Sequence, residues 1–120
     1  MAWTFNRIEP VSAQIVNQLR HEILNGKYRA NEQFPPVRQL AEEASVNPNT
    51  MQKALAKLEE EGLLYSRGTI GRFVTSDLSV LEDARVAMRR KAVNRWLREA
   101  GELGMTREEM IHYLKEEERK

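Results

Sequence analysis

Two proline steps decide where helices can begin in the first half of this sequence. Pro35-Pro36 cannot continue a preceding helix, yet its second proline suits the first turn of a new one. Asn47-Pro48 is another start signal, because an Asn side chain can accept a hydrogen bond from a free amide of the first turn. We therefore predict short helices over 36–44 and 48–61, separated by about three residues as in a helix-turn-helix.

Apolar side chains recur at helical spacing in both segments and in a third that precedes them, residues 11–25. Gly26 follows this first segment and Gly62 follows the last, at positions where helices commonly end in a left-handed residue. Three helices with one apolar face each can pack around a common core. The residues predicted to face that core are Ile15, Val16, Leu19, Ile23, Val37, Leu40, Ala41, Ala44, Met51, Ala54, Leu55 and Leu58.

The next segment has the pattern of a β-hairpin. Residues 63–67 and 72–75 are predicted strands, and the stretch from Gly68 to Gly71 supplies the glycines of the turn. Three helices followed by such a hairpin make a winged helix-turn-helix, which we place at residues 1–76. The predicted fold class is mainly α with a small β wing.

Two further helices are predicted after residue 77. The first runs from Leu78 until Gly101 interrupts it, and the second starts at the capping-box pattern Thr106 to Glu109 and extends toward Glu118. Two helices of this length cannot enclose a core of their own. We therefore expect residues 77–120 to form an α-helical hairpin for dimerisation, packed against a second copy of the chain.

Apolar residues of this hairpin are the candidates for the dimer interface, although packing within one chain is the alternative for each of them. The second helix is expected to turn Met110, Ile111 and Leu114 inward. The predicted dimerisation residues are Leu81, Met88, Trp96, Ile111 and Leu114.

Composition argues against several classes of protein. The 120 residues contain no cysteine and no apolar run long enough to cross a bilayer, and the N-terminus lacks the pattern of a signal peptide. We therefore expect a cytoplasmic protein without a membrane partner. The net charge of +1 is uninformative, so any affinity for DNA must come from the local arrangement of charges.

An enzyme is one alternative function. The sequence has no cysteine nucleophile, and His21-Glu22 is not followed by the second histidine of a zinc-protease helix. His112 and the runs of Glu residues have the positions of solvated helix surfaces. We expect no enzymatic activity, no metal site and no cofactor.

DNA recognition has its best candidates at the start of the third helix, because a recognition helix places its N-terminal residues against base edges in the major groove. Asn and Gln can pair with adenine, and Thr and Lys can contact bases or phosphates. The alternative is that Asn47 only caps the helix while the other residues form a solvated face. The candidates are Asn47, Asn49, Thr50, Gln52 and Lys53.

Two more regions could contact the phosphate backbone. Arg38 lies near the start of the second helix, where free amides attract phosphate, although an ion pair with Glu42 is the alternative. At the hairpin, Arg67 and Arg72 flank glycines, and Gly68 allows the backbone to approach DNA closely, although an ordinary turn with two solvated arginines would look the same.

A winged helix can also be a protein-docking module, because a fold does not fix a function. The two functions differ in the surface they need. A DNA-binding protein should gather Arg38, Lys53, Arg67 and Arg72 on one face, whereas a docking module should leave an apolar patch there.

The sequence resembles the GntR family of bacterial regulators over about residues 11–75. The likeness is carried by Ile15, Leu19, Ile23-Leu24-Asn25-Gly26-Lys27-Tyr28, Phe34-Pro35-Pro36-Val37-Arg38-Gln39-Leu40-Ala41, Val46-Asn47-Pro48-Asn49-Thr50-Met51-Gln52-Lys53-Ala54, Leu58-Glu59-Glu60-Glu61-Gly62-Leu63 and Gly71-Arg72-Phe73-Val74. The resemblance implies a DNA contact at Arg38, a reading surface over 47–52, and a wing at Arg67-Gly68.

The sequence departs from the common family pattern at the reading surface. Pro48-Asn49 replaces a Ser/Thr-Arg pair, and Gln52 stands where another Arg is common, so base choice is expected to rest more on Asn and Gln. The Asn-Pro-Asn-Thr form and the short two-helix tail are similar to the YtrA-like subfamily. That likeness implies dimerisation, repression and often control of transporter genes, with double-stranded operator DNA as partner. We also allow for a small-molecule effector at the dimer junction, whose class the sequence does not indicate.

Overall fold

The computed structural model describes residues 3–119. Met1 and Ala2, at the start of the first predicted domain, and Lys120, at the end of the second, lie outside the described residues. The chain divides into two compact units between Ala84 and Arg85. The boundary predicted between residues 76 and 77 separates a DNA-binding domain from a dimerisation domain, and it stays a prediction. Helix α4 (Leu78–Glu102) contributes residues to both units.

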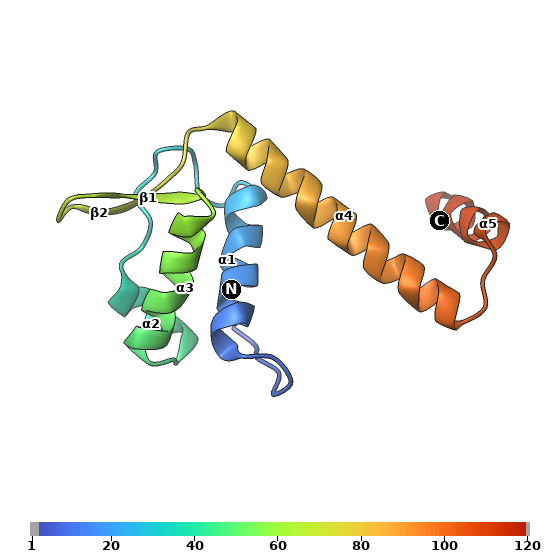
Figure 1. Cartoon of the computed structure of the whole chain (residues 1–120), viewed down its shortest axis with the longest axis horizontal. Coiled ribbons are helices and arrows are strands. Elements are labelled where there is room, and N and C mark those ends of the chain that lie inside the picture. Colours follow the sequence, from blue (N-terminus) through green and yellow to red (C-terminus); the bar gives the residue numbers. More distant parts are fainter. Residues whose placement is uncertain (1–2, 120) are drawn as a thin grey trace. The chain divides into compact units, whose positions relative to one another are not determined.

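The first unit is built on three helices, α1 (Val11–Leu24), α2 (Val37–Ala44) and α3 (Pro48–Glu60). Helix α3 packs against both α1 and α2, and Figure 1 shows it between them. The apolar faces predicted from the sequence meet here. The fully buried core side chains include Ile15, Leu19, Ile23, Leu40, Met51, Leu55 and Leu58.

The turn between α2 and α3 has the backbone geometry that a tight helix-turn-helix needs. Ser45 ends α2 in the left-handed region at φ 55°, which is rare for a residue with a side chain. Asn47 then caps α3, because its Oδ1 accepts a hydrogen bond from the Asn49 amide at 2.7 Å, and Pro48 occupies the first turn. The first amides of α3 are therefore paired with Asn47 at this turn, since Asn49 donates to its side chain and Thr50 and Met51 donate to its carbonyl.

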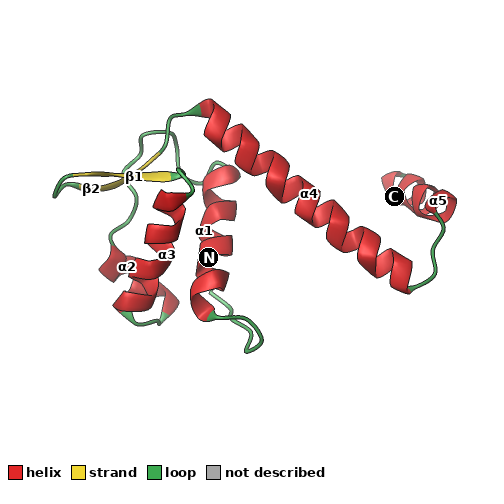
Figure 2. Ribbon diagram, in the orientation of Figure 1, coloured by secondary structure: helices red, strands yellow, loops and turns green. Residues whose placement is uncertain are grey.

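A two-stranded antiparallel wing follows α3 (Figure 2). Strands β1 (Leu64–Arg67) and β2 (Gly71–Val74) pair in a register that places Leu64 opposite Val74 and Arg67 opposite Gly71. The turn is closed by a hydrogen bond from the Ile70 amide to the Arg67 carbonyl at 2.9 Å. The predicted fold class, mainly α with a small β wing, is confirmed.

The linker before α2 also joins the wing, which the sequence analysis did not predict. Gln33 forms an isolated antiparallel bridge with Phe73. The Phe34 amide donates to the Arg72 carbonyl and the Asn31 amide donates to the Val74 carbonyl, each at 2.8 Å. Helical periodicity is absent from this linker, and a pairing of so few residues leaves no alternation to detect.

Helix α4 begins at a cap and ends later than predicted. Asp77 Oδ1 accepts hydrogen bonds from the Ser79 amide and hydroxyl, which explains the start at Leu78. Gly101 does not interrupt the helix as predicted, because an exposed glycine can remain helical at a cost of about 1 kcal/mol. Gly104, at φ 73°, provides the left-handed residue after the helix end.

Helix α5 (Arg107–Glu118) starts at the predicted capping box. Thr106 Oγ1 accepts from the Glu109 amide at 3.1 Å, and Glu109 Oε1 accepts from the Thr106 amide at 2.9 Å. The helix buries no residue within the chain, so the prediction that Met110, Ile111 and Leu114 point inward is wrong for a single copy. Met110 is half-buried, whereas Ile111 and Leu114 are exposed. Their exposed fractions are 41% and 52%.

Across the part of the chain that the structure describes, no helix is both long enough and apolar enough to cross a membrane. Helix α4 is long, but basic and acidic residues recur along it.

Candidate nucleic-acid interface

The first turns of α3 present polar side chains on one face and apolar side chains on the other. Asn49, Gln52 and Lys53 are exposed, whereas Met51 and Ala54 are buried against the other helices. Thr50 is half-buried at the edge of the polar face. In residues 3–119 the side chains of Gln52 and Lys53 make no hydrogen bond or ion pair, so their donors are available to a ligand.

Asn47 differs from these residues because its side-chain oxygen already serves the helix. The hydrogen bond to the Asn49 amide satisfies one of the free donors of the first turn. The alternative weighed for this residue, a pure cap, therefore has direct support in the structure. A contact of Asn47 with DNA stays a prediction, and it would have to use the amide nitrogen.

Arg38 is exposed in the first turn of α2. The alternative prediction for Arg38, an ion pair with Glu42, is not met in the described residues. The Arg38 guanidinium has no other hydrogen-bond partner there. A guanidinium has five N–H donors, so an exposed and unpaired one can meet a phosphate without first breaking a contact. This arrangement is compatible with the predicted phosphate contact.

Arg67 and Gly68 lie at the exposed end of the wing. The Arg67 guanidinium lies 4.9 Å from the centre of the Phe73 ring, a cation–π contact that holds the side chain along the hairpin. Gly68 takes φ 51°, and the space where a Cβ would project is open. Close approach of backbone to phosphate is therefore unobstructed at this turn.

Arg72 is placed differently from the other predicted contacts. Its Nε donates a short hydrogen bond to Glu59 of α3, and the same carboxylate oxygen accepts from the Ser66 hydroxyl at 2.8 Å. The carboxylate of Glu59 thus connects α3 with both strands of the wing. We name the three residues Glu59, Ser66 and Arg72 the wing clamp.

The wing clamp also changes the acidity of its carboxyl group. Partial burial by itself raises the pKa of Glu59, but hydrogen bonds from Arg72 and Ser66 and the charge of Arg72 outweigh this effect and leave the pKa below its ordinary value. Glu59 therefore stays ionised and keeps attracting Arg72. Of the four cations expected on the DNA side, three are exposed and this one is turned back onto its own chain.

Gln33 is a second brace of the wing that the sequence analysis missed. Its Nε2 donates to the Ile70 carbonyl in the turn at 2.9 Å. Gly71 has φ 133° beside it, and a Cβ at this position would come within 3.1 Å of the same Nε2. A glycine at a strand end and a polar residue two positions before Pro35 form too weak a pattern to predict that contact.

The exposed faces of α2 and α3 hold no apolar patch. Among residues 3–119, the large exposed hydrophobic side chains belong to other segments, and in the first unit these are Ile8, Val11, Ile70 and Leu78. The surface that a docking module would need is therefore missing beside Arg38 and Lys53. Within the same described residues, no group of His, Asp and Glu side chains could hold a metal ion.

The predicted dimerisation residues differ in how far they are buried within one chain. Leu81 is 7% exposed and lies in the core of the first unit, so its apolar surface is already covered within one chain. Met88 and Trp96 are half-buried, and Ile111 and Leu114 are exposed. The second unit also exposes four apolar residues that the sequence pattern did not predict at the interface, Val93, Leu97, Leu103 and Tyr113.

Two curated relatives match almost the whole chain. The "Uncharacterized HTH-type transcriptional regulator YhcF" of Bacillus subtilis is 26% identical over 111 residues, which are 92% of this chain and 92% of that protein. The "HTH-type transcriptional repressor YtrA" of the same organism is 27% identical over 108 residues, covering 89% of this chain and 83% of that protein. The likeness therefore includes the short C-terminal region.

Two solved structures are also similar to this chain. A "GntR family transcriptional regulator from Listeria monocytogenes" superposes with a TM-score of 0.86 at 31% identity, covering 93% of this chain and 98% of that one. The DNA-binding domain of AraR, solved in complex with operator ORX1, superposes with a TM-score of 0.57 at 26% identity, covering 62% of this chain and 95% of that domain.

The sequence model of the family described as "Bacterial regulatory proteins, gntR family" matches residues 11–74, which include α1, the helix-turn-helix and the wing. Together with full-length relatives that share the short C-terminal region, this match decides the classification. The chain belongs to the GntR family of bacterial regulatory proteins and is a transcriptional regulator of its YtrA-like subfamily.

Proposed function

We propose that this regulator is a dimeric repressor that binds double-stranded operator DNA through α3, Arg38 and the wing. One observation carries the proposal most directly. The polar face at the start of α3 and the Arg38 side chain at the start of α2 are exposed and free of partners within the described chain, on a fold whose neighbour was solved on an operator.

The residues divide by role in this proposal. Arg38 and Arg67 contact phosphates and so fix the position of the protein on the duplex, because the phosphate backbone is the same in every DNA sequence. Asn49, Thr50, Gln52 and Lys53 face base edges, where Asn and Gln pair with adenine and Lys with guanine. Asn47 and Arg72 mainly shape the surface, one by capping α3 and the other through the wing clamp.

Dimerisation is proposed through the second unit. Val93 and Leu97 lie one helical turn apart on α4, and Ile111 and Leu114 lie on one face of α5, all of them exposed. From Arg89 to Arg98, α4 carries basic side chains and no acidic one, whereas α5 is rich in Glu. Antiparallel packing of α4 from one copy against α5 from another would bury the apolar faces and place the basic side chains of α4 beside the Glu residues of α5.

A two-fold dimer makes the operator a pseudo-palindrome. Its half-sites should lie about 10 bp apart, or a multiple of that distance, so that both α3 helices reach one side of the duplex. Transporter genes as targets are carried over from the subfamily likeness, and the cytoplasmic location is carried over from the composition. A small-molecule effector at the dimer junction is part of the same proposal.

DNase footprinting of the purified protein on the DNA upstream of its own gene tests the proposal. We expect one protected, pseudo-palindromic segment at physiological salt, and transcription from that DNA in vitro should fall as protein is added. Protection of DNA without any sequence preference would contradict operator recognition. Binding to a partner protein and not to DNA would favour the docking-module function instead.

A further inference from the structure

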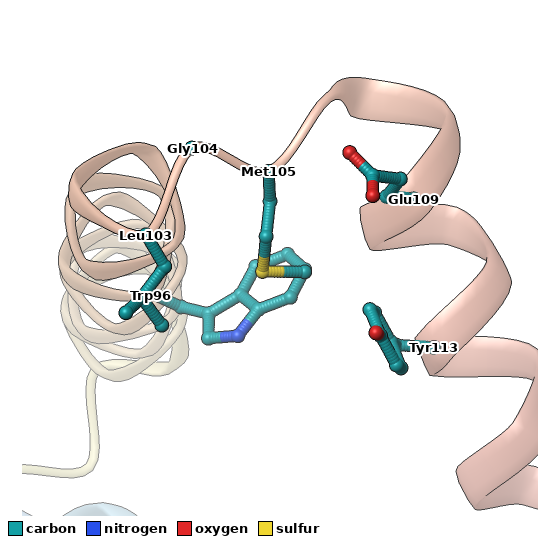
Figure 3. A pocket seen from close by; sticks show the side chains of 6 residues that line it. All are labelled: Trp96, Leu103, Gly104, Met105, Glu109 and Tyr113. Carbon is teal, nitrogen blue, oxygen red and sulfur yellow. The ribbon is translucent and has the colours of Figure 1, made fainter.

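The second unit contains an open pocket at the junction of α4 and α5, with a volume of about 510 Å³ (Figure 3). Trp96 projects from α4, Tyr113 and Glu109 project from α5, and Met105 extends from the connecting loop. A pocket of this size suits a small organic molecule. Its lining is completed by Leu103 and Gly104.

The two aromatic rings face the pocket without closing it. Trp96 and Tyr113 make no ring contact with each other in residues 3–119, where Tyr113 instead meets His112 edge-on at 5.9 Å. A flat or methylated group could therefore lie against both rings. Met105 adds a polarisable thioether, which adapts to the shape of an apolar ligand.

Glu109 supplies the charge of the pocket. Of the six lining residues in the described chain, it alone is charged. The capping box holds its side chain in place, because Oε1 accepts from the Thr106 amide at 2.9 Å. Hydrogen bonds from the Thr106 amide and hydroxyl lower the pKa of Glu109, so the carboxylate is ionised at neutral pH.

We propose that this pocket binds a small organic cation, such as a quaternary ammonium compound, with its methyl groups against Trp96 and Tyr113 and its charge beside Glu109. Aromatic rings attract cations through their negative faces, with Trp the strongest of them. An anion would be repelled by the carboxylate, and a neutral molecule would gain nothing from it. The effector role of such a ligand rests on the proposed repressor function, but its binding does not.

Tryptophan fluorescence can measure this binding directly. The chain has two tryptophans, so Trp3→Phe leaves Trp96 as the sole reporter inside the pocket. We would titrate this protein with choline and with 3,3-dimethyl-1-butanol, which has the same shape but a carbon in place of the charged nitrogen. We expect a saturable change with choline and at least about tenfold weaker binding of the alcohol.

Two matched variants isolate the carboxylate. Glu109→Gln removes the charge but keeps the capping box, because a Gln oxygen can also accept from the Thr106 amide. Glu108→Gln removes a carboxylate from the same turn that does not line the pocket. We expect about tenfold weaker choline binding for the first variant and unchanged binding for the second, with equal helix content by circular dichroism.

No saturable signal with choline would overturn the proposal, and this is the result expected if a second copy of the chain fills the pocket. Equal binding of choline and the neutral alcohol, or unchanged choline binding in Glu109→Gln, would overturn it as well. The titration contains no DNA, whereas footprinting without choline tests operator binding alone. Failure of one proposal is therefore distinguishable from failure of the other.

Discussion

Arg38 is the side chain whose predicted role can be tested most simply. It is exposed and unpaired in the described chain, so Arg38→Ala should cost little stability but remove one phosphate contact. Operator affinity should fall several-fold, and the slope of log K against log salt should decrease by about 0.9. Filter binding across a salt series measures both quantities.

Arg7→Ala is the matched control, because it removes one exposed cation that precedes α1 and lies outside α2, α3, the wing and the second unit. Its salt slope should equal that of the unaltered protein. An Arg38→Ala slope that also stays unchanged would remove Arg38 from the set of phosphate contacts.

Glu59 is a positioning residue in the wing clamp. Glu59→Gln leaves Arg72 without its charged acceptor, which should lower the free energy of unfolding by about 1 to 2 kcal/mol. Because the wing is then held less firmly to α3, we also expect weaker operator binding. Glu60→Gln is the control, since its pair with Lys57 is exposed and 3.8 Å long and should be worth less than about 0.5 kcal/mol. Urea unfolding and filter binding of both variants test this assignment, which fails if they behave alike.

The wing clamp also predicts a dependence of stability on acid. The pKa of Glu59 is lower in the folded chain than its ordinary value of 4.5, so the folded form binds the proton less readily than the unfolded form. Its stabilising contribution is fully present above that ordinary value and is lost as the pH falls below it. The stability difference between the unaltered chain and Glu59→Gln should therefore shrink below pH 4.5, and urea melts over that range would show whether it does.

The sequence predicts which residues are capping or cationic, but it does not predict the residues from other elements with which they interact. Arg38 and Arg72 both looked like exposed cations, and only the fold shows that β2 brings Arg72 against Glu59. The local cap at Asn47 could be predicted, because a cap depends on neighbours in the chain. The clamp could not, because it joins residues from separate elements.

Among the elements, the wing has the strictest backbone requirement. Gly71 takes φ 133°, where a side chain is strained, and an added Cβ would meet Gln33. Gly71→Ala should therefore destabilise the hairpin by about 1 to 3 kcal/mol and loosen operator binding. Gly101→Ala is the contrasting change, because Gly101 is helical with open space around it and alanine should stabilise α4 by up to about 1 kcal/mol. Thermal unfolding should move in opposite directions for the two variants.

Elements with long periodic patterns were predictable, and irregular ones were not. The three core helices lie within a residue or two of their predicted bounds, since burial of an apolar face fixes both pattern and structure. Gly101 was misread as a helix end because a glycine signals a stop only when its backbone turns left-handed, as Gly104 does. The bridge at Gln33 depends on a single tertiary pairing that leaves no local signal.

The chain combines one unit with a buried apolar core and a second unit whose large apolar side chains are mostly exposed to solvent. The first unit buries its hydrophobic faces within one copy, whereas α5 buries none. A short helix without buried residues is marginal in water. This difference is the physical reason to expect that the second unit packs against a second copy of the chain, as proposed above.

Charged substitutions on the open faces test that assembly. Leu97→Glu and Ile111→Glu should each prevent a second copy from packing, because burying an unpaired carboxylate in an apolar interface costs several kcal/mol. Light scattering at micromolar concentration should then report a monomer mass, whereas the unaltered chain should report a dimer. Operator affinity should fall at least about 100-fold, since each half-site must be bound without the linked second contact. Ile8→Glu is the control, because Ile8 is equally apolar and more exposed but lies outside the second unit. If the unaltered chain is itself a monomer at these concentrations, the two-fold operator geometry loses its basis, and a single half-site should then be protected in the footprint.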